Sequence, residues 1–145
     1  YTLEVIREQT DQITSAFSSP IYDGGNRTAA PTIYYNLIGK DIRRLPVSSS
    51  LDLRRMNYYP RGGEELTLQR MWEYCQIYPE HTVTYLHDKG SLSKSTSNEL
   101  VRRVVTSAVL SEECRRMADL GCNICTYNFY LIPNAMSPGN MFRAS

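Results

Sequence analysis

The sequence predicts a mixed α/β fold in which a mostly parallel sheet is flanked by helices. Stretches with helical periodicity alternate with β-branched and aromatic stretches, in the order helix, strand, helix, strand, helix. This alternation is typical of βαβ connections, which join parallel strands through a helix. A length of 145 residues suits one domain with its own hydrophobic core, so we expect a single domain over residues 1–145.

The first half of the chain contains two predicted helices and one predicted strand. Apolar residues at near-helical spacing indicate a helix over residues 2–17. A nearly continuous apolar and aromatic run over residues 31–39 predicts a strand that is covered on both faces. Residues 40–63 are polar and rich in Arg and Ser, which favours a loop. A second helix is expected over residues 64–78, with an apolar stripe formed by Leu68, Met71, Trp72 and Cys75.

The second half of the chain adds a strand, a long helix and a tail. The β-branched stretch over residues 81–86 predicts a short strand. The spacing Thr96-x-x-Glu99 is that of a capping box, so it predicts the start of a helix that runs to about Met117. Gly121 is expected to close this helix. The tail, residues 122–145, is expected to hold two short strands.

Composition argues against two classes of partner. The net charge is only +1, which gives no general attraction to nucleic acid or to an anionic membrane. No apolar run approaches the roughly 20 residues that span a bilayer, so we expect no membrane segment within this chain. The chain begins without Met and stops just after a predicted strand begins, so we expect a fragment that is truncated at both ends.

The strongest functional signal is a polar loop after the strand predicted at residues 81–86. It reads His87-Asp88-Lys89-Gly90-Ser91. In parallel sheets ligands bind outside the carboxyl ends of the strands, where we expect this loop and the loop after Gly39 to lie. An imidazole serves as a general base, a carboxylate accepts hydrogen bonds from sugar hydroxyls, and a lysine attracts phosphate. The alternative is a polar, solvated loop with no function.

The start of the next helix contributes two further candidates. Asn98 and Arg102 are expected near its N-terminus, where free N–H groups and the helix dipole favour an anion. Arg102 is alternatively an ordinary exposed helix residue.

The four cysteines leave several interpretations open. Cys122-x-x-Cys125 with Cys114 upstream offers three zinc thiolates, if His or Cys75 supplies the fourth ligand. A disulfide from Cys114 to either Cys122 or Cys125 is expected if the protein is secretory. Cys75 is most simply a core residue, because it lies on an apolar helix stripe. Asn26-Arg27-Thr28 matches an N-glycosylation sequon and is compatible with a secretory route.

Beyond these patterns, the chain resembles a family of mostly uncharacterised eukaryotic proteins, many of them from microalgae. Members carry a strand followed by His-x-Lys-Gly-Ser, then an Asn and a pair of Arg on the next helix, which match Asn98 and Arg102-Arg103 here. The similarity covers most of the chain apart from residues 40–60. Other segments that carry it are Tyr34-Tyr35-Asn36-Leu37-Ile38-Gly39, the helix start Glu65-Leu66-Thr67-Leu68, Ala108-Val109-Leu110-Ser111-Glu112-Glu113-Cys114, Cys122-Asn123-Ile124-Cys125 and Pro138-Gly139-Asn140-Met141-Phe142.

Two of these motifs are also similar to rhamnan-synthesis-type polysaccharide glycosyltransferases. Those proteins have a His-x-Lys-Lys-Ser motif and a Gly-x-Met-Phe-Trp segment in comparable places. This distant resemblance implies a partial GT-A-like domain, which is the fold of nucleotide-diphospho-sugar transferases. At its end the sequence departs from the pattern, because Phe142-Arg143-Ala144 stands where an aromatic residue followed by Ala-Arg is expected.

The resemblance implies a glycosyltransferase-like domain that acts on a sugar nucleotide and a glycan acceptor. His87 and Asp88 are then the expected catalytic residues. A donor phosphate and sugar would be held by Lys89, Gly90, Ser91, Asn98, Arg102 and Asn140. No metal ligand is assigned, because the Asp-x-Asp pair of such enzymes is missing, and a divalent cation stays optional.

Two alternatives to a transferase stay open. The first is a non-catalytic carbohydrate-binding domain, and the second is a secretory module that a disulfide or zinc stabilises. The compartment is not fixed by the sequence, although the cysteines and the sequon favour the lumen of the secretory pathway or Golgi.

Overall fold

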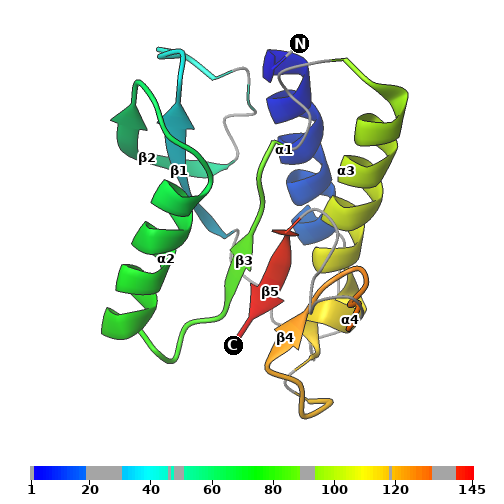
Figure 1. Ribbon diagram of the computed structural model, residues 1–145. Helices are drawn as coiled ribbons and strands as arrows, with labels where there is room; N and C mark the ends of the chain where they lie inside the picture. The colour runs from blue at the N-terminus through cyan, green and yellow to red at the C-terminus, as the bar shows by residue number, and fades with distance from the viewer. Residues whose placement is uncertain are drawn as a thin grey trace.

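The computed structural model has a mixed α/β architecture (Figure 1). It describes residues 2–18, 31–45, 47, 51–88, 94–117, 119–131 and 140–145. The helices are α1 (Thr2–Ser18), α2 (Glu65–Ile77), α3 (Thr96–Val109) and α4 (Glu112–Arg115). The strands are β1 (Thr32–Ile38), β2 (Asp52–Tyr59), β3 (Val83–Tyr85), β4 (Ile124–Cys125) and β5 (Phe142–Ala144).

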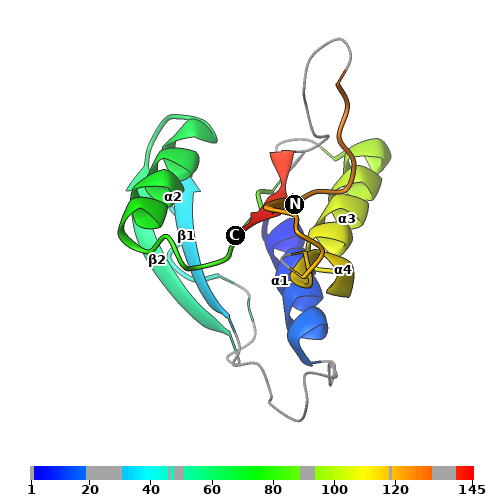
Figure 2. The same cartoon turned by 90° about the horizontal axis from the view of Figure 1, so that it is seen from below.

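Three layers are visible in the two views (Figures 1 and 2). Strands β1 and β2 lie with α2 on one side of the molecule, and α1, α3 and α4 lie on the other. The short strands β3, β5 and β4 lie between them and form one antiparallel sheet in that order. The mixed α/β class is therefore confirmed, although only the β1–β2 pairing is parallel among the described strands.

Strand β2 corrects the prediction of a loop over residues 40–63. It pairs in parallel with β1 from Thr32–Asp52 to Ile38–Tyr59. The polar composition misled the prediction, because five of the eight residues of this strand are exposed. Leu53, Asn57 and Tyr59 are half-buried, whereas Arg54, Arg55, Met56 and Tyr58 are exposed.

Burial in β1 and α2 is also lower than the sequence predicts. Only the first half of β1 alternates between exposed and half-buried positions, with Tyr34 46% exposed, and in the second half only Leu37 is fully buried, so the strand is not covered on both faces along its length. Helix α2 has no fully buried residue, and Trp72 of the predicted apolar stripe is 58% exposed. The layer formed by β1, β2 and α2 therefore exposes both polar and apolar side chains to solvent.

The best-packed part of the molecule lies where α3 meets the antiparallel sheet. Val105, Val109 and Met141 form the buried core cluster, against which Leu86 and Val101 pack. Val5 and Ile13 of α1 are buried as well. Met141 precedes β5, so this core fixes the sheet relative to the helical layer.

The ends of α3 differ in detail from the prediction. Ser95, and not Thr96, is the N-cap, and its hydroxyl accepts a hydrogen bond from the Asn98 N–H at 3.5 Å. The helix ends at Val109, and Ser111 caps the separate short helix α4. Ser and Thr are both good caps, so sequence alone did not separate neighbouring candidates. Gly121 therefore does not close α3 as predicted, although its positive φ of +69° is a conformation that glycine adopts readily.

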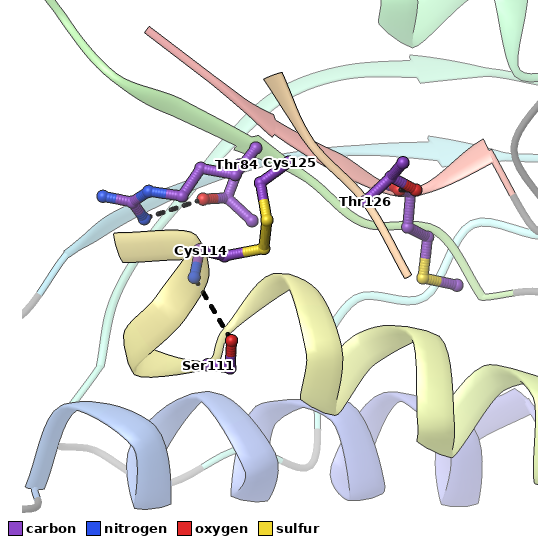
Figure 3. The surroundings of a disulfide bond; sticks show 7 residues. Thr84, Ser111, Cys114, Cys125 and Thr126 are labelled. Atoms are coloured by element: carbon purple, nitrogen blue, oxygen red, sulfur yellow. Dashed lines mark hydrogen bonds between the residues drawn. A yellow bond between two sulfur atoms is a disulfide. The ribbon is translucent and has the colours of Figure 1, made fainter. Parts of the chain in front are cut away.

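One disulfide connects the helical layer to the sheet. Cys114 of α4 is bonded to Cys125 of β4 (Figure 3). The structure therefore selects one of the two pairings that the sequence left open. Cys122 is exposed and Cys75 is half-buried, and both are free thiols. None of the helices within the described ranges is long and apolar enough to span a bilayer.

Candidate functional site

The predicted site lies at the edge of the molecule where the strands β1, β2 and β3 end. The starts of α2 and α3 lie at the same edge (Figure 1). All three strands run toward this edge, and the helices that follow β2 and β3 run away from it (Figure 1). The loop that begins at His87 leaves β3 here and leads into α3.

The start of the loop is held by a buried polar network. Gln9 of α1 donates its side-chain N–H to the backbone carbonyl of His87 at 2.9 Å. The same amide nitrogen lies 3.4 Å from the hydroxyl of Thr106 in α3. Gln9 and Thr106 are 8% and 0% exposed, so these bonds are shielded from water. The position of His87 is therefore fixed by two helices that are distant in sequence.

Tyr85 and His87 present their side chains on one side of β3. Their rings are stacked, with centroids 6.1 Å apart and planes inclined by 8°. Tyr85 also contacts the ring of Phe142 on β5, with centroids 5.6 Å apart. Residues two positions apart in a strand share a face, which explains why the imidazole lies over the phenol.

Glu64 is a site residue that the sequence analysis missed. It lies directly before α2 and makes a side-chain hydrogen bond with Tyr85. Burial raises the pKa of the Tyr85 phenol, and the nearby carboxylates of Glu64 and Asp88 raise it further. Both carboxylates therefore disfavour ionisation of the Tyr85 phenol at the end of β3.

One oxygen of Glu64 is in an unusual environment. Its Oε1 atom is buried and has no hydrogen-bond partner among the described residues. An unpaired buried carboxylate oxygen costs free energy, because it has lost its bonds to water. Such an atom is a candidate contact for a donor group of a ligand.

Asp88 and Asn140 lie at the same edge, from opposite strands. Asp88 is exposed and follows His87 directly. Asn140 is exposed and has a positive φ of +51°. The β3–β5 pairing ends with Tyr85 opposite Phe142, so His87 and Asn140 each lie two residues beyond the last pair, at the same end of the pairing.

Arg102 has a different environment from the one expected for a ligand contact. It is 1% exposed, and its guanidinium lies 3.5 Å from the Oε1 atom of Glu8 in α1. Arg103 approaches the other oxygen of Glu8 at 2.9 Å from the solvent side. A direct contact between Arg102 and a solvent-borne phosphate is not supported by this geometry. Arg102 joins α1 to α3.

The remaining predicted residues divide into described and undescribed ones. Asn98 is half-buried in the first turn of α3, where its backbone N–H completes the Ser95 cap. Lys89, Gly90 and Ser91 lie outside the described residues, as does the sequon at Asn26.

The sequence predicts Glu64 at the start of a helix, which the structure confirms, but it does not connect this residue with the end of a strand. Gly62-Gly63 precedes it, at the end of the stretch that was predicted as a loop over residues 40–63. Once β2 is recognised as a strand, Glu64 becomes a carboxylate at the carboxyl end of a parallel strand, which is where ligand-binding residues gather.

The cysteines do not form the zinc site that the sequence left open. Cys114 and Cys125 are joined to each other, so they offer no pair of thiolates. Within the described ranges, no group of three or more His, Cys, Asp or Glu side chains is placed to hold a metal ion.

Comparison with known proteins identifies the family of the chain. No curated protein and no solved structure matches it. A family model matches residues 1–145, which is the full length of the chain, and its description is "Domain of unknown function (DUF8361)". The chain therefore belongs to this family, DUF8361.

Proposed function

We propose that this domain is glycosyltransferase-like and binds a sugar nucleotide at the edge formed by Glu64, Tyr85, His87 and Asp88. The observation that carries the proposal is the buried Oε1 atom of Glu64, which has no partner among the described residues. The carboxylate of Glu64 lies next to the Tyr85 phenol, and the Tyr85 ring is stacked with the His87 imidazole at the end of β3. Sugars supply many hydroxyl donors, and a carboxylate oxygen is a good acceptor for them.

The side chains at this edge suit the transfer of a sugar. In the proposed reaction, His87 or Asp88 accepts the proton of a hydroxyl group on the glycan acceptor. The oxygen of that hydroxyl attacks the anomeric carbon of the donor sugar at the same time. The bond from that carbon to the diphosphate oxygen breaks, and the nucleoside diphosphate leaves with the electron pair. Lys89 would balance the charge that develops on the leaving group.

Glu64 and Tyr85 have a positioning role in this proposal. The Tyr85 phenol is neutral at physiological pH, and its hydrogen bond with Glu64 holds that carboxylate in position. Glu64 then orients a sugar hydroxyl through its second oxygen. A GT-A-like fold belongs to the same proposal, and it is supported by the mixed α/β class and by strands that end at one edge beside the starts of the helices.

The Cys114–Cys125 disulfide supports placement in an oxidising compartment, because disulfides persist mainly there. This agrees with a role in polysaccharide or glycoprotein glycan synthesis.

A thermal-shift experiment with a panel of sugar nucleotides tests the proposal. At about 100 times Kd, a bound donor stabilises the protein by about 2.7 kcal/mol, which raises Tm by about 5–10 °C for a domain of this size. We expect His87→Ala and Lys89→Ala to lose most of this shift. Glu73→Gln on the exposed face of α2 serves as the control and retains it.

Two results are decisive for the proposal. Stabilisation by none of the donors at saturating concentration contradicts it. Stabilisation without release of nucleoside diphosphate in the presence of glycan acceptors contradicts catalysis and instead indicates a carbohydrate-binding domain that has lost its chemistry.

A further inference from the structure

The chain that follows β4 presents a run of apolar side chains to solvent. Residues 127–131, which we call the apolar arm, are all exposed, and four of the five are large apolar residues, namely Tyr127, Phe129, Tyr130 and Leu131. Figure 2 shows the chain leaving the sheet after β4 and projecting from the body of the molecule. Successive side chains of a non-helical chain point to different sides, so the arm is apolar on more than one side.

The base of the apolar arm is fixed to the core. Cys125 of β4 is bonded to Cys114 of α4 (Figure 3). The next residue, Thr126, donates its hydroxyl to the backbone carbonyl of Met141 at 3.1 Å, and Met141 is fully buried. A covalent bond and a hydrogen bond therefore fix the point at which the arm leaves the molecule.

The apolar arm also lies in an uncharged stretch of the sequence. Residues 120–142 contain no Asp, Glu, Lys, Arg or His, although 21% of the chain is charged. Leu120 and Ile124, before the arm, are exposed as well. Soluble surfaces ordinarily mix charged residues with apolar ones, and a larger exposed apolar patch marks a site of interaction. The partner of this surface is therefore recognised by burial of apolar side chains and not by charge.

We propose that the apolar arm enters the interfacial region of a lipid membrane and holds the domain at the membrane surface. Tyr127 and Tyr130 suit the level of the lipid headgroups, because their rings are apolar and their hydroxyls stay in contact with water. Phe129 and Leu131 would then enter the boundary between the headgroups and the acyl chains, to a depth of about 5–10 Å. This is attachment at one face of the membrane, and not a span.

An irregular backbone is tolerated at this depth. Within the hydrocarbon core an unpaired N–H or C=O group is costly, but water still reaches the headgroup region. One backbone group of the arm is already paired locally, because the Phe129 N–H donates to the Oδ1 atom of Asn128 at 2.8 Å. Phe129 therefore enters the interface without an unpaired N–H group.

Lipid fits the arm better than a protein or a sugar does. A flat protein surface, including that of a second copy of this chain, would cover one side of the arm and leave apolar side chains on the other side in water. A sugar would stack on the aromatic rings, but Leu120, Ile124 and Leu131 have no ring face for such a contact. Lipid surrounds an inserted segment and accepts aliphatic and aromatic side chains alike.

Co-sedimentation with phosphatidylcholine vesicles tests the proposal, alongside a second set of vesicles that also contains phosphatidylserine. We expect binding to the neutral vesicles and only a small change with phosphatidylserine or salt, because the arm is uncharged and the net charge of the chain is +1. No binding to neutral vesicles would refute the proposal, and so would binding that requires phosphatidylserine and is lost at high salt. The protein is used without sugar nucleotide, so the result does not depend on the proposed sugar-nucleotide site.

Matched variants locate the contact. We expect Phe129→Ser and Leu131→Ser each to weaken binding to neutral vesicles at least about tenfold. Ile77→Ser is the control, because Ile77 is 69% exposed and Leu131 is 72% exposed, but Ile77 belongs to α2 in a different layer (Figure 2). All three side chains are exposed, so Tm should stay nearly unchanged. Unchanged vesicle affinity in both arm variants would contradict the proposal.

Tryptophan fluorescence and sedimentation distinguish lipid from the other partners. Phe129→Trp combined with Trp72→Phe places the only tryptophan of the chain on the arm. We expect its emission to shift to shorter wavelength with neutral vesicles and to stay unchanged with soluble oligosaccharides of glucose. Sedimentation velocity without vesicles should give a monomer. An equal emission shift with the oligosaccharides would overturn the proposal in favour of sugar binding, and a dimer that Phe129→Ser dissociates would overturn it in favour of a second copy.

Discussion

The side-chain amide of Gln9 donates a hydrogen bond to the backbone carbonyl of His87, 78 residues away in the sequence, at 2.9 Å. This bond joins the first helix to the loop that carries the candidate site. It means that the geometry of the site depends on the packing of α1 against α3, and not only on the strand from which the loop emerges.

The Gln9 network should make a measurable contribution to stability. Gln9→Ala removes the donor to the His87 carbonyl and a partner of the Thr106 hydroxyl, so we expect a loss of about 1–3 kcal/mol. Gln12→Ala is the control, because Gln12 also bonds to α3 but through hydrogen bonds that are exposed to solvent. Urea unfolding of both variants checks this, and equal losses would show that burial of the network is unimportant.

Glu8 should contribute substantially to stability, because it pairs with a buried arginine. Glu8→Gln leaves the Arg102 guanidinium, which is 1% exposed, without its carboxylate. We expect the free energy of unfolding to fall by about 3 kcal/mol. This is near the lower end of the losses caused by breaking a buried ion pair, because Glu8 is partly exposed. Exposed Glu4 in the same helix provides the control, Glu4→Gln. A loss below about 0.5 kcal/mol for Glu8→Gln would contradict the buried pair.

Gly62 should not tolerate a side chain. Its φ of +140° is a conformation that other residues rarely adopt, and a Cβ atom there would collide with the side chain of Leu66. We expect Gly62→Ala to destabilise the protein by about 1–3 kcal/mol and to disturb the start of α2, where Glu64 lies. Gly39→Ala provides a comparison at a positive φ with open space around it. A larger loss in Gly39→Ala would be inconsistent with this account.

The disulfide should stabilise the domain by restricting the unfolded chain. It closes a loop between residues that are 11 apart, so reduction is expected to cost about 3 kcal/mol. In denaturant, thiol counting should give two free thiols before reduction and four after it. Cys122→Ser should leave Tm nearly unchanged, whereas Cys114→Ser lowers it. A count of four thiols without reductant would contradict the bond.

Tyr85 should give stability a dependence on alkaline pH. Its folded pKa is raised above the ordinary value of 10.0, so the folded state retains the phenol proton more strongly than the unfolded state does. The stability is therefore fully present below about pH 10 and falls as pH rises toward the folded pKa, by up to about 1.4 kcal/mol per pH unit. Tyr85→Phe should remove this dependence. An identical alkaline profile in the variant would contradict the assignment.

The elements with clear periodicity could be predicted from the sequence. Helix α1, strand β1 and helix α2 were located because their apolar residues recur at regular spacing, and the strands β4 and β5 because turn residues separate them. Strand β2 could not be recognised, because its exposed residues include Arg54, Arg55 and Met56 in succession, which gives no strand-like alternation. Its parallel partner β1 is distant in sequence, and that pairing carries no local signal.

The candidate site was predicted only in part for a similar reason. The position of His87 and Asp88 after a strand could be read from local sequence, and the register of β3 and β5 then places Asn140 nearby. The role of Arg102 depends on Glu8 in another helix, and that of Glu64 on an element that was missed. Both depend on tertiary packing, which spacing along the chain does not show.

Calorimetric titration of the best-stabilising sugar nucleotide into Glu64→Gln tests the central claim most directly. Glu64→Gln keeps the shape of the side chain but removes its charge, so we expect a Kd at least about tenfold weaker than that of the unmodified protein. Glu73→Gln on the exposed face of α2 should leave Kd unchanged. Equal affinities in the unmodified protein and Glu64→Gln, or no binding of any sugar nucleotide to the unmodified protein, would contradict the claim.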